Sequence, residues 1–371
     1  MLLKKNMLEE ELFAVLRLQA TPNVGDIIAK KLIRHVGSAQ QIFKEQNSSL
    51  LKIDGIGEFV TKQLQKTSFL NRVEEELKYI VDGKINFSYF LDSSYPKRLQ
   101  HCVDGPLLLF HDGKINWNQE KIISIVGTRN LTNYGRSFCN DLIAQLASHN
   151  PIIVSGYAYG TDICAHKAAI ENNLQTLAVL AHGLDDMYPK THKKYMRAVM
   201  NNGGFITEFW HHEKPMRENF LKRNRIVAGI SQATIIIESA EKGGSLVTAD
   251  IANSYNRDVF ALPGRFDDVY SKGCNNLIKN NQAHLLNSAD DIIAMLNWDI
   301  PQKSAPKQTS LFIDLSGEEQ KVYDYLQHNG KELLDVIALD CEIPVYKLSS
   351  LLIQMELKGA VKTLPGKMFE V

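Results

Sequence analysis

The chain has 371 residues, of which 44% are hydrophobic and 23% charged, a composition typical of a soluble globular protein with two or three domains. Its 42 basic residues equal its 42 acidic residues, so a site for a polyanion must be a local patch. The five cysteines lack metal-ligand spacing, and no apolar run has the length of a membrane span. These features argue against a disulfide framework, a zinc site and a membrane anchor. With no secretion signal at the start, they predict a cytoplasmic protein.

Residues 1–80 are predicted to form a helical domain, because Leu, Ile, Val and Phe recur at three- and four-residue spacing. Two glycine turns interrupt this pattern, TPNVG at 21–25 and IDGIG at 53–57. A helix, a glycine turn and a second helix form the helix-hairpin-helix pattern, in which backbone N–H groups can approach a phosphate. A helical domain of another kind, SAM-like and used for protein docking, explains the same pattern equally well. Both interpretations stay open.

Residues 81–298 are predicted to form an α/β domain, which begins with a turn-rich connector over about 81–115. Short β-branched runs then alternate with amphipathic stretches long enough for crossover helices. The runs are KIISIV, PIIVS, TLAVLA, FIT, ATIIIE and DVFAL. Because polar residues hardly interrupt them, they suit a parallel sheet covered on both faces. The predicted fold class is α/β, with a doubly wound, Rossmann-like core.

The C-terminal part is predicted to be a linker over 299–316 and a winged helix over 317–371. The linker has two prolines and several small polar residues, and the last segment has three helical patterns followed by a hairpin around Pro365 and Gly366. Six lysines and nine acidic residues give this segment a net charge of −3. A DNA-reading winged helix is usually basic, so we expect a protein-contact role.

Ligands of an open parallel sheet bind outside the carboxyl ends of its strands, so the segments after each strand are the candidate site. Arg129 follows the first predicted strand and offers a planar cation suited to phosphate oxygens. Ser155 and Gly156 follow the second strand at a glycine turn. Several such corners at one sheet edge predict an anion-binding pocket.

The densest basic cluster of the α/β domain is Lys222, Arg223, Asn224 and Arg225, next to Phe220. Three cations in four residues are costly to bury without partners, so we expect most of them to face a ligand, although Arg225 could pair with Glu208 or Glu238. An aromatic ring beside them could stack on a base. The last corner is the turn Gly243, Gly244 and Ser245, whose N–H groups and hydroxyl could hold an anion.

Motifs for common catalytic chemistry are absent. The sequence has no P-loop, no GxSxG elbow, no HExxH and no GxGxxG after the first strand. A binding protein without cofactor or metal therefore fits better than an enzyme.

Seven motifs, in this order and spacing, closely resemble the bacterial DNA-processing protein A (DprA/Smf) family. They are GTRNLTNYG, VSGYAYGTD, HGLDDMYP, ENFLKRNRIVAG, ESAEKGGSLVTA, LPG at 262–264 and KGCNNLI, within about residues 95–290. One departure is Tyr159, where the family usually has an arginine. The resemblance implies a sequence-independent single-stranded DNA-binding protein that protects incoming strands in natural transformation and loads the recombinase RecA onto them.

The resemblance also implies site residues and an assembly. Arg129 and the 222–225 cluster would hold the DNA backbone, and the turns at 155–156 and 243–245 would frame the pocket. A homodimer would form through the α/β domain, for which the segment LLNSADDIIAML at 285–296 is a candidate surface.

Two other functions remain open. One is a nucleotide-binding sensor or a phosphoribohydrolase-type enzyme of Rossmann-like fold, for which Glu238 is the nearest candidate acid. The other is a regulator that reads duplex DNA through the winged helix, which the net charge of −3 disfavours.

Overall fold

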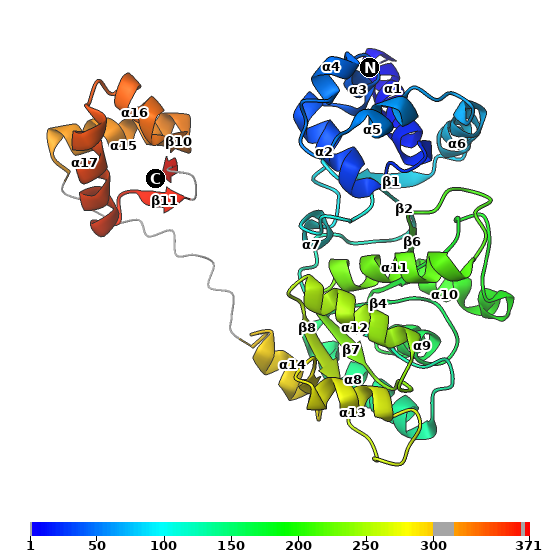
Figure 1. Cartoon of the computed structure of the whole chain (residues 1–371). Helices are drawn as coiled ribbons and strands as arrows, with labels where there is room; N and C mark the ends of the chain where they lie inside the picture. Colours follow the sequence, from blue (N-terminus) through cyan, green and yellow to red (C-terminus); the bar gives the residue numbers. More distant parts are fainter. Residues whose placement is uncertain (1, 300–314, 365–367) are drawn as a thin grey trace. The chain divides into compact units, whose positions relative to one another are not determined.

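The structure, a computed structural model, describes residues 2–299, 315–364 and 368–371. The chain divides into two compact units, 1–299 and 300–371 (Figure 1). Most of the predicted linker, 299–316, lies outside the described residues. The helical region and the α/β region thus share one unit, and a boundary between them at residue 80 remains a prediction.

The N-terminal region is helical, as predicted. Its helices within the described residues are α1 (Leu2–Ala20), α2 (Asp26–Val36), α3 (Ala39–Ile42), α4 (Asn47–Leu50), α5 (Glu58–Leu64) and α6 (Leu70–Asp82). One glycine turn separates α1 from α2 and the other separates α4 from α5. The core of this region includes Leu16, Leu32, Ile33 and Val73, none of which is exposed.

The predicted turn-rich connector at 81–115 also contributes two strands to the sheet. It contains β1 (Asn86–Tyr89), α7 (Lys97–Gln100) and β2 (Leu108–Gly113). β1 pairs antiparallel with β2, and β2 pairs antiparallel with β6 (Gly203–Thr207). Both strands extend one edge of the sheet, toward the helical region (Figure 1).

All six predicted strands of the α/β core are present. Besides β6 they are β3 (Ile122–Val126), β4 (Ile152–Ser155), β5 (Thr176–Val179), β7 (Ala233–Ile236) and β8 (Asp258–Ala261), and β9 (His284–Leu285) adds an edge. The sheet order is β1-β2-β6-β5-β4-β3-β7-β8-β9, with parallel pairing from β6 to β9. The order reverses at β3, which pairs with both β4 and β7. This arrangement confirms the doubly wound fold class.

Alternate residues of the buried strands serve two hydrophobic cores, because successive side chains of a strand point to opposite faces. Ile123 and Ile125 face the core made with α8 (Asn133–Leu146), α9 (Thr161–Glu171) and α14 (Ala289–Met295). Ile122 and Val126 face the core made with α11 (Arg217–Ile230), α12 (Gly244–Ser254) and α13 (Lys272–Lys279). The short α10 (Met196–Asn201) packs beside β6, and two 3-10 turns, Ala147–His149 and Lys190–Tyr195, complete the unit.

The candidate dimer segment is largely internal. Its apolar residues Leu286, Ala289, Ile292 and Ile293 are buried in the core under α8, and only Leu285 and Met295 are well exposed among its large apolar side chains. Its periodicity is therefore that of a core helix.

The second unit has the predicted winged-helix elements. They are α15 (Gly317–Asn329), β10 (Glu332–Leu333), α16 (Leu334–Asp340), α17 (Val345–Leu357), β11 (Lys362–Leu364) and β12 (Met368–Glu370). Two lysines around α17 are held in ion pairs, Lys347 with Glu318 at 2.6 Å and Lys358 with Glu319 at 2.7 Å. The exposed face of α17 presents Tyr346, Ile353 and Leu357 instead.

Candidate nucleic-acid interface

A cleft of about 610 Å³ opens at the carboxyl ends of β3 and β7, where the strand order reverses. This switch point is where open α/β sheets bind their ligands. The lining residues come from the ends of these strands, the turn after β4 and the starts of α9, α11 and α12. Those that bear charge are Arg129, Asp162, Arg217, Arg223 and Lys242.

The turn after β3 places Arg129 at the mouth of the cleft. Its exposed guanidinium lies over the ring of Phe220, with 5.3 Å between Cζ and the ring centroid. The loop is fixed by a 2.7 Å hydrogen bond from the backbone N–H of Thr128 to the carbonyl of Glu238. A cation stacked on an aromatic ring at the mouth of a cleft suits a strand whose bases also stack.

Arg223 lies beneath the cleft floor and is 5% exposed. Its Nη1 donates to the carbonyl oxygen of Gly156 at 2.6 Å and to that of Val179. Burial lowers the pKa of Arg223 to about 10, while the carboxyl of Asp162 acts in the opposite direction. Burial likewise raises the pKa of Asp162 against the attraction of Arg223. Within the described residues Arg223 forms no ion pair, although Asp162 attracts it, so part of its field reaches an anion in the cleft.

A glycine is required at position 156 by the close approach of Arg223, because a Cβ there would collide with the guanidinium. Gly160 has φ of 76°, a left-handed conformation that favours glycine at the start of α9. The turn after β4 is thus shaped around Arg223.

Ser155 is outside the cleft, contrary to the prediction. Its hydroxyl is buried and donates to the carbonyl of Ile125 at 2.6 Å, because the last residue of β4 still points into the sheet. Tyr159, at the position of the usual family arginine, is 43% exposed and lies beyond the cleft wall, where its hydroxyl contacts that of Thr191 at 3.0 Å.

Lys222 and Arg225 also lie outside the cleft, on the opposite side of α11. Lys222 Nζ is 3.0 Å from Glu208 Oε2, and Arg225 pairs with Glu208 and, at 3.2 Å, with Asp26. The cluster is thus divided: Arg223 and Asn224 line the cleft, while Lys222 and Arg225 pair with carboxylates outside it. Neighbouring helical residues point about 100° apart, so one cluster in sequence divides between two surfaces.

The turn after β7 closes the cleft from the other side. Gly243 precedes α12, and Gly244 and Ser245 form its first turn, with no side chain capping the N–H groups of that turn. The Ser245 hydroxyl donates to Ser239 Oγ at 3.0 Å, and the neighbouring Lys242 is exposed. Free N–H groups at a helix start and an exposed lysine together favour an anion.

Seven of the ten predicted site residues therefore line one cleft: Arg129, Gly156, Arg223, Asn224, Gly243, Gly244 and Ser245. Their role in binding stays a prediction. Arg217 was missed by sequence reasoning. Arg217, Phe220, Leu221 and Asn224 follow the spacing of one helix face, and this spacing was the signal that could have found it. Within the described residues, Arg129, Arg217 and Lys242 form no ion pair.

Glu238, the candidate catalytic acid, is committed to a structural contact. Its carboxylate accepts hydrogen bonds from the backbone N–H of Thr132 at 2.9 Å and from the Thr132 hydroxyl at 2.5 Å, at the start of α8. It is 1% exposed. Of the two partners considered for Arg225 from the sequence, Glu208 and not Glu238 forms the ion pair within the described residues. A carboxylate at a helix N-terminus is stabilised by the helix dipole. This geometry gives no support to a hydrolase.

The described residues contain neither a membrane-spanning helix nor a cluster of metal ligands. No helix there combines the length and apolar character that crossing a bilayer requires. No group of three or more His, Cys, Asp or Glu side chains there could hold a metal ion.

The fold and cleft define a doubly wound α/β protein with a cationic cleft at its switch point. Profiles of two families match the chain, DNA recombination-mediator protein A over residues 86–297 and the DprA winged helix domain over residues 301–367. The chain therefore belongs to the DNA-processing protein A (DprA/Smf) family.

Relatives of known name agree with this membership. The DNA processing protein DprA of Streptococcus pneumoniae is 37% identical over 204 residues, which cover 55% of this chain and 72% of that protein. Protein Smf of Synechocystis is 28% identical over 385 residues, covering 94% and 95% of the two chains.

Two solved structures are similar to this one. The X-ray structure of Streptococcus pneumoniae DprA matches with a TM-score of 0.66 and 30% identity, over 76% of this chain and 97% of that chain. DNA processing protein A of Helicobacter pylori, described for its single-stranded DNA binding mode, matches with a TM-score of 0.52 and 30% identity, over 58% and 97%.

Proposed function

We propose that this protein binds single-stranded DNA without sequence preference, and that the strand passes through the switch-point cleft. The observation that carries the proposal is a set of three exposed cations around a cleft with an aromatic ring and a glycine turn. These cations, Arg129, Arg217 and Lys242, form no ion pair with any residue that the structure describes. Cations bind the phosphates of any sequence, and a ring such as Phe220 stacks on any base. The Helicobacter pylori relative, whose single-stranded DNA binding mode is described, has the same fold.

The wider role follows from family membership. We propose that the protein protects incoming strands in natural transformation and loads RecA onto them, as a homodimer in the cytoplasm, and that it acts as a binding protein and not as an enzyme. The commitment of Glu238 to Thr132 supports the last point. The RecA role is tested by the rate at which RecA assembles on a single strand with and without this protein. An unchanged rate would remove the loading role but leave strand binding intact.

The test of strand binding is a salt titration on single-stranded oligomers. Each phosphate contact contributes about 0.7 to the slope of log affinity against log salt, so Arg129→Ala should weaken binding of every base sequence and lower the slope by about 0.7. The matched control is Arg136→Ala, which removes an exposed arginine of α8 that does not line the cleft. Equal affinity and slope for the two variants, with the fold intact by circular dichroism, would place DNA elsewhere.

A further inference from the structure

The segment between β6 and α11 connects the sheet to the helical region by side-chain contacts at three of its residues. Trp210 Nε1 donates to Gln19 Oε1 of α1 at 3.1 Å, and Glu213 pairs with Arg72 of α6 at 2.7 Å. His211 contacts Glu76 of α6 as well, through its ring and its backbone N–H. This segment leads into α11, one side of which lines the cleft. The helical region therefore contacts the residues that immediately precede α11.

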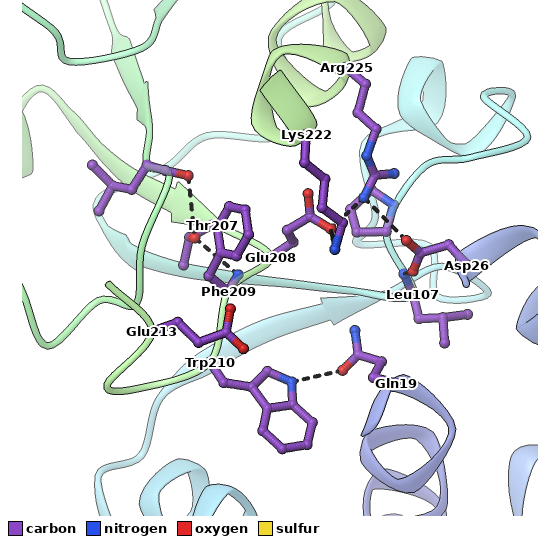
Figure 2. A network of polar contacts seen from close by, with 12 residues as sticks. Gln19, Asp26, Leu107, Thr207, Glu208, Phe209, Trp210, Glu213, Lys222 and Arg225 are labelled. Atoms are coloured by element: carbon purple, nitrogen blue, oxygen red, sulfur yellow. Dashed lines mark hydrogen bonds and ion pairs between the residues drawn. The ribbon is translucent and has the colours of Figure 1, made fainter. Parts of the chain in front are cut away.

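A buried ionic bridge joins α11 itself to the helical region. Arg225 Nη2 lies 3.2 Å from Asp26 Oδ2, at the first residue of α2, and also contacts Glu208 at the end of β6 (Figure 2). The side chains of Arg225 and Glu208 are 9% and 2% exposed. Asp26 Oδ1 accepts the backbone N–H of Leu107 at 3.0 Å, which fixes the carboxylate in place.

Burial and the charges of its two partners act in opposite directions on the pKa of Arg225. Burial by itself would lower the pKa of Arg225, but Glu208 and Asp26 raise it, so the guanidinium stays charged. Removal of one partner from a buried ion pair is destabilising. Without the charge of Asp26, Arg225 would keep Glu208 as a partner but lose its ionic contact with the helical region. Asp26 is itself held by Leu107, and Glu208 directly follows β6, so these two carboxylates hold one side of α11 against the helical region and the sheet.

The first glycine turn of the helical region, at 21–25, lies next to the ion pair between Asp26 and Arg225. Gly25 and Asp26 line a small cavity of about 130 Å³ together with Glu208 and Glu213. The cavity is also lined by Arg72 and Lys222, which pair with Glu213 and Glu208. The carboxylate of Asp26, beside this turn, is engaged by Arg225.

We infer that Asp26 is a positioning residue for the cleft: through Arg225 it holds α11 in the orientation that presents Arg217, Phe220 and Asn224 to the DNA strand. The inference rests on the proposed function and deepens it. The helical region then sets DNA affinity without touching DNA.

The test uses the full-length chain with Asp26→Asn, which keeps the size and the acceptor for Leu107 but removes the charge. Loss of a negative charge should by itself strengthen binding to a polyanion. We expect the opposite, an affinity about threefold to tenfold weaker. The salt slope should stay unchanged, because no phosphate contact is lost. In the absence of DNA, amide hydrogen exchange in α11 should be faster in Asp26→Asn than in the unaltered protein.

The matched control is Glu75→Gln, which removes an exposed carboxylate of α6 and so changes the net charge equally. Gln19→Leu, which removes the hydrogen bond to Trp210, is the second variant and should act in the same direction as Asp26→Asn. Equal affinity and equal α11 exchange in Asp26→Asn and Glu75→Gln would overturn the inference. So would a loss of affinity with a shallower slope or with unchanged exchange. If the unaltered protein does not bind single strands, the proposed function fails, while α11 exchange still decides whether the bridge positions this helix.

Discussion

At the scale of single residues, the position of Arg223 depends on the absence of a side chain at Gly156. A methyl group there would displace the guanidinium from the carbonyl that it contacts at 2.6 Å. We predict that Gly156→Ala lowers the free energy of unfolding by about 1–3 kcal/mol and weakens single-strand binding. Urea denaturation measures the first effect. Gly244→Ala is the control for stability, since a Cβ at that position would meet nothing within 4 Å. A similar small effect on stability for both variants would contradict the packing argument.

A buried histidine under the cleft predicts how stability depends on pH. His166 is fully buried, with Nδ1 2.7 Å from Thr176 Oγ1. Burial, followed by the charges of His192 and Arg223, lowers its pKa from 6.5 to about 3. The unfolded chain therefore takes up a proton below pH 6.5 while the folded protein does not, so stability present above pH 6.5 is lost as pH falls toward 3. The loss is about 1.4 kcal/mol per pH unit.

The measurement is urea denaturation between pH 7 and pH 5, on the unaltered protein and on His166→Gln. Between pH 6.5 and 5 the variant should lose about 2 kcal/mol less than the unaltered protein. Parallel pH profiles for the two proteins would show that His166 does not account for the acid sensitivity.

Single residues also show where sequence reasoning succeeds. Arg129 and Gly243 were found because the carboxyl ends of parallel strands meet at one edge, a rule that needs only the positions of the strands. Ser155 was misplaced because the rule does not fix where a strand ends. A shift of one residue in the end of the strand decides whether a hydroxyl faces the sheet or the ligand. The Ser155 hydroxyl faces the sheet and donates to the Ile125 carbonyl at 2.6 Å.

At the scale of elements, α11 has two working faces. Arg217, Phe220 and Asn224 line the cleft, while Lys222 and Arg225 contact Glu208 on the far side. The sequence showed a basic cluster, and only the helical spacing separates its members. Assigning the faces required the tertiary partner Glu208, which is 14 residues away from Lys222 in the chain.

The two faces predict different salt responses. Arg217→Ala should weaken single-strand binding and lower the salt slope by about 0.7, as for any lost phosphate contact. Lys222→Ala should leave the slope unchanged, because this lysine is held by Glu208 outside the cleft. Filter binding over a range of salt concentrations distinguishes them. A lower slope for Lys222→Ala would mean that DNA also follows the far side of α11.

For the sheet too, a local sequence pattern predicts some strands and not others. The runs that became β3 to β8 were recognised because strands buried on both faces are apolar throughout. β9 has two residues, both exposed, and so has no such signature. β1 and β2 lie among prolines and aromatics, and the pairing of β2 with β6 is a non-local contact that no local pattern encodes.

At the scale of the whole molecule, residues 1–299 behave as one body in which the helical region supports the cleft. The core that lies under α11 continues into the helical region, where Leu16 and Leu32 belong to the same cluster as Val126 and Ile226. A helical pattern and an α/β pattern in sequence indicate two domains, but neither pattern reports how much surface the two share. The boundary at residue 80 stays a prediction that fragments of the chain can test.

This shared core predicts the behaviour of fragments. Residues 1–299 should melt cooperatively and bind single strands with the affinity and salt slope of the full chain, because the winged-helix unit has its own core and its lysines at α17 are ion-paired. Residues 81–299 should be much less stable. Deletion of residues 1–80 exposes Trp210, which is 5% exposed in the intact unit, and Leu107, which is fully buried there. We expect a Tm lower by on the order of 10 °C and weaker DNA binding, measured by calorimetry and filter binding. A fragment 81–299 with the Tm and affinity of 1–299 would show that the helical region is an independent domain.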